Sequence, residues 1–221
     1  MKILSFTAQG AYARFRCSHT TTSALTYSCI HPVAVRGLIG AMLGIEYHEL
    51  YEKTKDLQIG IKVLHPVIKD TQAFNLIPQT KNNGAANFQS RIQFLRDPLY
   101  QIFVQGEKEF LEDLKEVLVK RNFVFTPYLG NSEHIAKVKF LGMYESKTVK
   151  GTISDTVMEK EQVDFDKLDM NQVCFDRIPV KNNATREYQE YRNIVVGPGS
   201  RLLLKEEIEV FEVGEDYVYF L

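Results

Sequence analysis

The sequence contains no tryptophan, only three cysteines and no long hydrophobic run. The cysteines, Cys17, Cys29 and Cys174, are odd in number and show no CxxC spacing. This argues against a disulfide framework or a zinc site and favours a reducing cytosol. No apolar stretch approaches the length of a membrane span, and no signal-peptide pattern is present. We therefore expect a soluble, cytoplasmic protein with no membrane partner.

Acidic residues are absent from the first 45 positions, since the first one in the chain is Glu46. The same stretch holds four Lys or Arg residues, two histidines and many Ser and Thr hydroxyls. Gathering positive charge and hydrogen-bond donors in this way favours phosphate binding in a protein that is not basic overall. The residues of this stretch with candidate roles in RNA binding are Arg14, Arg16, Thr20, Thr21, Thr22, His31 and Arg36.

The charge balance differs between the two halves of the chain. Residues 1–100 hold 11 Lys or Arg and 6 Asp or Glu (+5), and residues 101–221 hold 16 and 22 (−6), giving the net charge of −1. One interpretation is the ordinary imbalance of any chain cut in two. The other is a basic nucleic-acid face in the first half and an acidic second half that faces protein subunits.

A length of 221 residues, 44% of them apolar, fits one large domain or one domain with an elaboration. The first predicted helix begins after His31, because Pro32 suits the first helical position. Apolar side chains follow at helical spacing as far as Gly44, a typical C-terminal stop. Gly37 and Gly40 inside this helix cost roughly 1 kcal/mol each relative to alanine, which indicates close approach by a packed strand or by a ligand.

Periodicity also predicts the other main elements. Alternating apolar residues indicate strands, whereas an apolar stripe with acids at its start and bases at its end indicates a helix. The strands are expected over residues 2–8, 57–64, 91–104 (with a bend at Asp97-Pro98) and 135–144, and the helix over 107–121.

A long hairpin is expected at about residues 66–90. Its polar tip contains Lys81, Asn82 and Asn83, and Asn83-Gly84 is a strong turn signal. Such a tip buries too little apolar surface to form a core, so the hairpin should project from the body as a thumb that contacts RNA.

The predicted order β, α, β, β, α, β is that of the ferredoxin-like fold shared by RNA-recognition modules. We therefore expect an α+β protein, with a ferredoxin-like (RRM-like) βαββαβ domain over residues 1–150. The chain beyond it, residues 151–221, is strand-like and acidic and is interpreted as a β-rich C-terminal extension.

The candidate chemistry is limited. No two acids stand with a histidine at ligand spacing, so we expect neither a metal nor another cofactor. Metal-free RNA cleavage needs a base, an acid and a cation around one phosphate, typically His, Tyr and Lys. His134 is the best candidate because it lies in a Gly-, Asn- and Ser-containing loop before a strand, whereas His31 is equally explained as a helix cap.

Four arginines have candidate roles in RNA binding. Arg14 and Arg16 suit phosphate or base contacts, because the guanidinium group bonds phosphate bidentately, and solvated edge arginines are the alternative. Arg91 and Arg96 follow the hairpin on one predicted strand. Since they are five residues apart, their side chains point to opposite faces, and at most one lies on a given RNA-binding face.

Together, four segments resemble the CRISPR-associated RAMP family called "Cas five", the subunit at the 5′ end of guide RNA in type I Cascade complexes. The overall pattern is closest to the type I-B branch. The segments are ARFR (13–16) followed by TTT (20–22), TYS (26–28) followed by HPVAVRGLIGAMLG (31–44), RIQFLRDPLY (91–100), and TPYLGNSEH (126–134).

The resemblance implies a ferredoxin-like domain with a hairpin thumb and a C-terminal β elaboration. It also implies binding of the crRNA 5′ handle, contact with the Cascade large subunit and the backbone subunit, and indirect contact with target DNA. One branch of the family cleaves precursor RNA with a Tyr/Lys/His site. Tyr128 and His134 fall near where such residues lie, but no Lys-His pair occurs here.

Two functions follow from the resemblance. The first is a non-catalytic RNA-binding subunit, and the alternative is a metal-independent endoribonuclease that uses Tyr128 and His134. The candidate RNA-binding residues are Arg14, Arg16, Thr20, Thr21, Thr22, His31, Arg36, Lys81, Asn82, Asn83, Arg91, Arg96, Tyr128 and His134.

Overall fold

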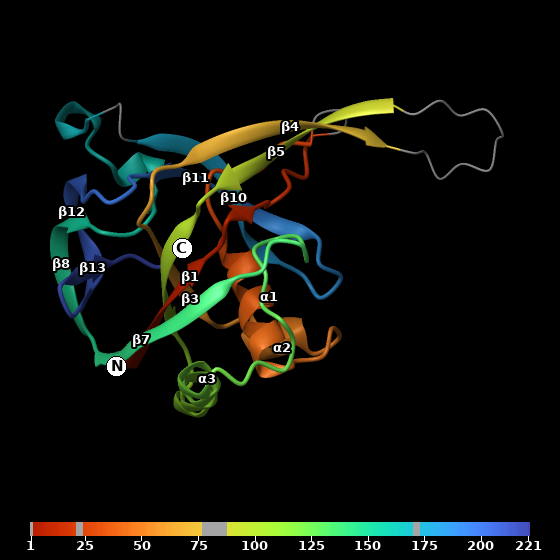
Figure 1. Ribbon diagram of the computed structural model, residues 1–221. Helices are drawn as coiled ribbons and strands as arrows, with labels where there is room; N and C mark the ends of the chain where they lie inside the picture. Colours follow the sequence, from red (N-terminus) through yellow and green to blue (C-terminus); the bar gives the residue numbers. More distant parts are fainter. Residues whose placement is uncertain (1, 21–23, 77–87, 170–172) are drawn as a thin grey trace.

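The computed structural model describes residues 2–20, 24–76, 88–169 and 173–221. Its centre is a four-stranded antiparallel sheet in the order β3–β6–β1–β7 (Figure 1). The strands are β1 (Lys2–Gln9), β3 (Gln58–Val63), β6 (Leu99–Gln105) and β7 (Lys137–Glu145). All four fall where the alternating pattern predicts a strand, and the α+β class is confirmed.

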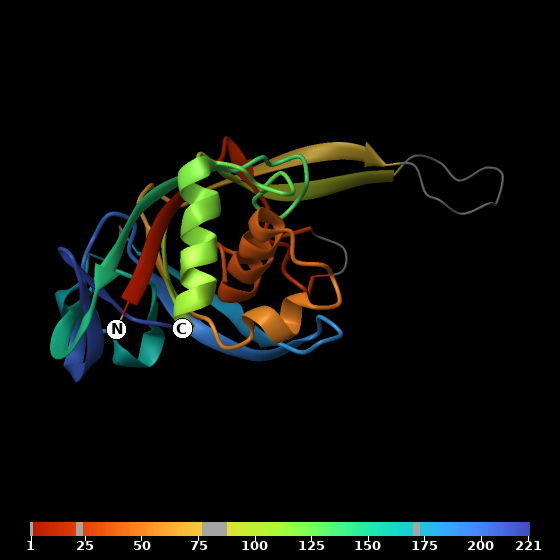
Figure 2. The same ribbon diagram turned by 90° about the horizontal axis from the view of Figure 1, so that it is seen from below.

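Two longer helices, α1 (Pro32–Leu43) and α3 (Lys108–Lys120), lie against one face of the sheet, where they contact β3, β1 and β7 (Figure 2). Both match their predicted positions. The short helix α2 (Leu50–Thr54) was not predicted, because five residues are too few to show a period. Within the described residues, no helix is long and apolar enough to cross a membrane.

Local signals explain the limits of α1. Pro32 occupies its first turn, and the His31 ring accepts a hydrogen bond from the backbone N–H of Ala34 (3.2 Å). At the other end, Gly44 has a φ of 70°, which a side chain would disfavour. The helix therefore begins and ends as the sequence predicts.

Among the described residues, no packed strand approaches the two glycines of α1, and both glycines line the cavity described below. An added methyl group at Gly37 would meet nothing within 4 Å. At Gly40 it would lie 2.4 Å from Cδ1 of Leu50, a side-chain atom of α2. Only Gly40 is thus required by packing, and its neighbour is a side chain.

The predicted hairpin is formed by β4 (Ile68–Leu76) and β5 (Phe88–Arg96), with β2 (Tyr12–Ala13) on the other edge of β5. It extends as an arm from the body (Figures 1 and 2). The single strand expected over 91–104 is divided between β5 and β6, which belong to different sheets. The division falls at Asp97, whose φ of 49° turns the chain before Pro98, at the predicted bend.

The C-terminal region forms two three-stranded sheets, in the orders β10–β11–β9 and β13–β12–β8. Its elements are β8 (Lys147–Ser154), β9 (Met158–Glu159), β10 (Cys174–Asn182), β11 (Tyr188–Val196), β12 (Leu202–Val213), β13 (Asp216–Val218) and the 3-10 turns η1 (Lys160–Gln162) and η2 (Phe165–Lys167).

These two sheets pack on opposite sides of the central sheet. Strand β10 contacts α1, and Ile178 and Ile194 join the large core on the helical side. On the other face, Val213 and Val218 pack against Phe103 of β6. The largest core cluster therefore contains residues from both sides of position 150, and the domain boundary placed there stays a prediction.

Candidate nucleic-acid interface

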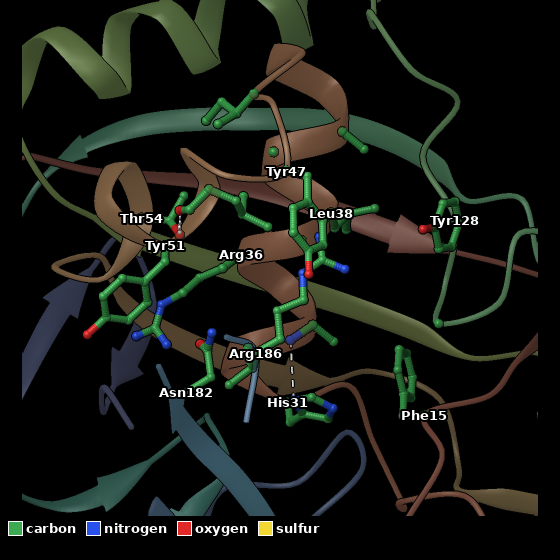
Figure 3. A pocket seen from close by; sticks show the side chains of 18 of the residues that line it. Phe15, His31, Arg36, Leu38, Tyr47, Tyr51, Thr54, Tyr128, Asn182 and Arg186 are labelled. Atoms are coloured by element: carbon green, nitrogen blue, oxygen red, sulfur yellow. Dashed lines mark hydrogen bonds between the residues drawn. The ribbon is translucent and has the colours of Figure 1, made fainter. Parts of the chain in front are cut away.

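A cavity of about 760 Å³ opens beside the N-terminal half of α1 (Figure 3). Four stretches that are distant in the sequence form its walls: the segment after β2, the chain from the end of α1 through α2, the loop before β7 and the tip between β10 and β11. The residues that line it include Arg14, Phe15, Arg16, His31, Arg36, Glu46, Tyr47, Tyr51, Phe125, Tyr128, Gly130, Arg186 and Tyr188.

The lining is positively charged and aromatic. Four arginines line it (Arg14, Arg16, Arg36 and Arg186), and among the described lining residues Glu46 is the one acid. Six Phe and Tyr side chains line the same cavity. Cationic groups attract phosphates, and aromatic rings offer surfaces on which unpaired bases stack, so this composition suits single-stranded nucleic acid.

Arg36 is a cation built into the floor of the cavity. Its side chain is only 8% exposed, and it donates hydrogen bonds to the backbone carbonyls of Val180 (3.1 Å) and Leu57 (3.2 Å). Both acceptors are uncharged, and the Arg36 Nε has no partner among the described residues. Burial lowers the Arg36 pKa, while the charges of Asp56 and Tyr51 oppose this effect. Arg36 thus ties α1 to β10 and adds positive charge to the cavity.

His31 is buried among aromatic rings at the edge of the cavity. It is 3% exposed, and its ring packs edge-on against Tyr27, Tyr188 and Phe15 at centroid distances of 5.5, 5.6 and 6.1 Å. Burial, assisted by the charge of Arg36, lowers the pKa of His31 to about 3. Because its Nδ1 caps α1, the geometry gives His31 a structural role at the cavity edge.

The loop before β7 is fixed against the segment that carries Arg14. The Arg14 backbone N–H donates to the Leu129 carbonyl (3.1 Å). Gly130 has a φ of 90°, and a methyl group there would lie 1.8 Å from the Arg14 carbonyl oxygen. Only glycine allows this approach, so Gly130 helps to place Arg14 and Phe15 at the cavity.

Tyr128 and His134, the pair proposed for cleavage, have different surroundings. Tyr128 is 43% exposed and lines the cavity, as Figure 3 shows. The His134 ring packs instead against Phe94 and Tyr12 at 5.5 and 6.4 Å and is not part of the cavity lining. Burial, in the first place, lowers the His134 pKa, and its buried Nε2 has no partner among the described residues.

The other predicted residues are scattered. The Thr20 hydroxyl donates to the Cys17 carbonyl (3.0 Å) and so stabilises a turn. Arg91 and Arg96 are exposed, and β5 pairs with β4 without a register shift between them, so they lie on opposite faces as predicted. Thr21, Thr22, Lys81, Asn82 and Asn83 lie outside the described residues.

Arg186, Tyr47 and Tyr188 also line the cavity, and they were not predicted from the sequence. Arg186 belongs to the acidic half of the chain, for which contact with protein subunits was one of two interpretations. A run of Asn, Ala and Thr before it marks a turn, but no local pattern connects that turn with Tyr47. Within the part of the chain that the structure describes, no three His, Cys, Asp or Glu side chains form a group suited to a metal ion.

Comparison with known families identifies the class of protein. Residues 3–201 match the model of the family described as CRISPR-associated protein (Cas_Cas5). This match spans most of the chain, and the protein therefore belongs to that CRISPR-associated family. Among curated proteins, no sequence is similar enough to match.

Solved structures share the fold over almost the whole chain. A chain of a "CRISPR RNA-guided surveillance complex" has a TM-score of 0.55 and 14% identity, with 96% of this chain and 95% of that chain covered. A CRISPR protein from Archaeoglobus fulgidus has a TM-score of 0.56 and 13% identity, with 99% and 98% covered. At such low identity, the likeness concerns the fold alone.

Proposed function

We propose that this protein is a guide-RNA-binding subunit of a type I CRISPR effector complex, in which it holds the 5′ handle of the crRNA. The observation that carries the proposal is the composition of the cavity lining. Its described residues include four arginines and six Phe or Tyr side chains but one acid. Family membership supports the same function, as does the shared fold with a chain of an RNA-guided surveillance complex.

We also propose that the core is a ferredoxin-like βαββαβ unit. The order β3–β6–β1–β7, with α1 after β1 and α3 after β6, supports this assignment. One face of the sheet carries the helices, and the other packs against β12 and β13. The thumb, formed by β4 and β5, then projects from the loop between the second and third strands of the unit.

The partners are part of the proposal. The large subunit and a backbone subunit of the complex would contact this protein, and target DNA would be reached only through the assembled complex. The exposed arm of β4 and β5 is a suitable element for such contacts, because it extends beyond the body (Figure 1). Assignment to the type I-B branch stays a prediction.

We propose further that the protein has no nuclease activity of its own. Cleavage without a metal requires an acid and a base within hydrogen-bond reach of one phosphate. Tyr128 lines the cavity, whereas the partly buried His134 ring packs against Phe94 and Tyr12 and does not line it. This difference in surroundings favours RNA binding over the endoribonuclease alternative.

The test of RNA binding is its salt dependence. We expect Arg14→Ala with Arg16→Ala to weaken binding of repeat RNA and to reduce the salt slope by about 0.7 for each lost phosphate contact. Filter binding at several salt concentrations measures this slope. The matched control is Lys115→Ala with Lys120→Ala, which removes the same charge from α3, where both lysines pair with glutamates of their own helix. Equal slopes in both double variants would exclude the cavity from the RNA site.

A further inference from the structure

One wall of the cavity is a stacked arginine–tyrosine pair. The Arg186 guanidinium carbon lies 3.7 Å from the ring centroid of Tyr47, well inside the roughly 6 Å range of cation–π contacts. Tyr47 follows α1, and Arg186 lies at the tip between β10 and β11 (Figure 3). The pair therefore brings two distant parts of the chain together in one wall of the cavity.

Both members of the pair are accessible. Tyr47 remains 62% exposed although the guanidinium covers part of its ring, and Arg186 is also exposed. The adjacent Glu187 carboxylate accepts hydrogen bonds from Asn183 (2.9 Å) and Thr185 (3.3 Å). These bonds hold the Glu187 side chain within the turn, while the Arg186 guanidinium lies over the Tyr47 ring.

Three further arginines line the cavity behind the pair. Arg36 lies at its floor with bonds only to neutral carbonyls, and Arg14 and Arg16 line another wall. A volume of about 760 Å³ lies within the roughly 300–1,000 Å³ range of small-ligand sites. The space therefore suits a unit of nucleotide size, and it is too small for a duplex.

We infer that this cavity receives one unpaired nucleotide of the bound RNA, whose base stacks on the Tyr47–Arg186 pair. The inference rests on the proposed RNA-binding function and adds the position and the kind of contact. Aromatic rings and arginine planes are the surfaces on which proteins stack splayed RNA bases. Stacking accepts any base, so this contact positions the RNA without reading its sequence.

The experiment combines an abasic scan of the RNA with variants of the protein. Repeat RNA is prepared with one abasic site at each position in turn, and its dissociation constant is measured by fluorescence anisotropy. For the wild-type protein, we expect one position to show a loss of about 5- to 150-fold, the usual effect of one stacked base. Tyr47→Ala should show the same loss with intact RNA and no further loss at that position.

Two further variants serve as controls. Tyr47→Phe keeps the ring and should bind as the wild type does, which separates loss of stacking from loss of folding. Arg186→Ala should weaken binding of intact RNA, and an abasic site at the position identified with Tyr47→Ala should cause no further loss. Arg177→Ala should retain the wild-type profile, because Arg177 also lies over a tyrosine (Tyr191, 5.4 Å) on the β10–β11 hairpin but does not line the cavity.

The possible failures are distinguishable. If the wild-type protein does not bind the intact RNA, the proposed function itself is wrong. If it binds, but Tyr47→Ala leaves the abasic profile unchanged, then RNA binding stands and the nucleotide site is refuted. That second result would also be expected if a side chain of a protein partner occupied the cavity.

Discussion

Replacing Gly130 by alanine tests how the loop before β7 places the cavity wall. Alanine at a φ of 90° is in the left-handed region, which costs an L-residue about 1–2 kcal/mol. Its methyl group would also lie 1.8 Å from the carbonyl oxygen and 2.6 Å from the carbonyl carbon of Arg14. Both contacts are with backbone, so the neighbouring segment must move.

We expect these two effects to destabilise the protein by at least about 2 kcal/mol, since overpacking alone typically costs 1–3 kcal/mol. For a chain of 221 residues, that corresponds to a fall in Tm of about 4 °C or more. The displaced Arg14 should also weaken RNA binding at temperatures where the variant is still folded.

The matched control is Gly37→Ala, the same chemical change where the added methyl group would meet nothing within 4 Å. Because Gly37 lies inside α1, alanine should stabilise the protein by roughly 0.5–1 kcal/mol. Thermal unfolding followed by circular dichroism measures both variants. The reasoning is refuted if the Tm of Gly130→Ala equals that of the wild type, or if Gly37→Ala loses as much stability as Gly130→Ala.

Three other predictions follow from the same structure. Burial holds the His31 pKa at about 3 in the folded state, below its ordinary 6.5, so the unfolded state binds more protons between these values. Stability should therefore fall as the pH drops below about 6.5, and His31→Asn should reduce this dependence in melts from pH 7 to 4. Precursor RNA incubated with the purified protein in EDTA should remain uncut, and a defined cut abolished by His134→Ala or Tyr128→Phe would establish the endoribonuclease instead. Shortening the hairpin between Phe74 and Asn87 should leave the Tm within a few degrees but impair assembly of the guide complex, whereas global unfolding would place the hairpin in the core.

The sequence by itself determined the elements that depend on neighbouring residues. Proline, the His31 cap and a terminal glycine set the limits of α1, because helix ends are fixed by groups within one turn. The positions of the central strands were predicted from local apolar patterns. The bend at Asp97 and Pro98 was recognised for the same local reason, although its consequence, a change of sheet, was not. That β1 and β6 are buried on both faces, by the helices and by β12 and β13, depends on the tertiary structure.

Only the tertiary structure decided which side chains form the site. Arg36 was predicted to bind RNA from its neighbours in the sequence, but its burial and its bonds to Val180 and Leu57 depend on β10 and β3 packing around α1. The Tyr47–Arg186 contact likewise exists because the β10–β11 hairpin packs beside α1. Contacts between distant segments depend on how whole helices and strands pack their apolar faces together. A local pattern of residues does not predict which elements will pack against each other.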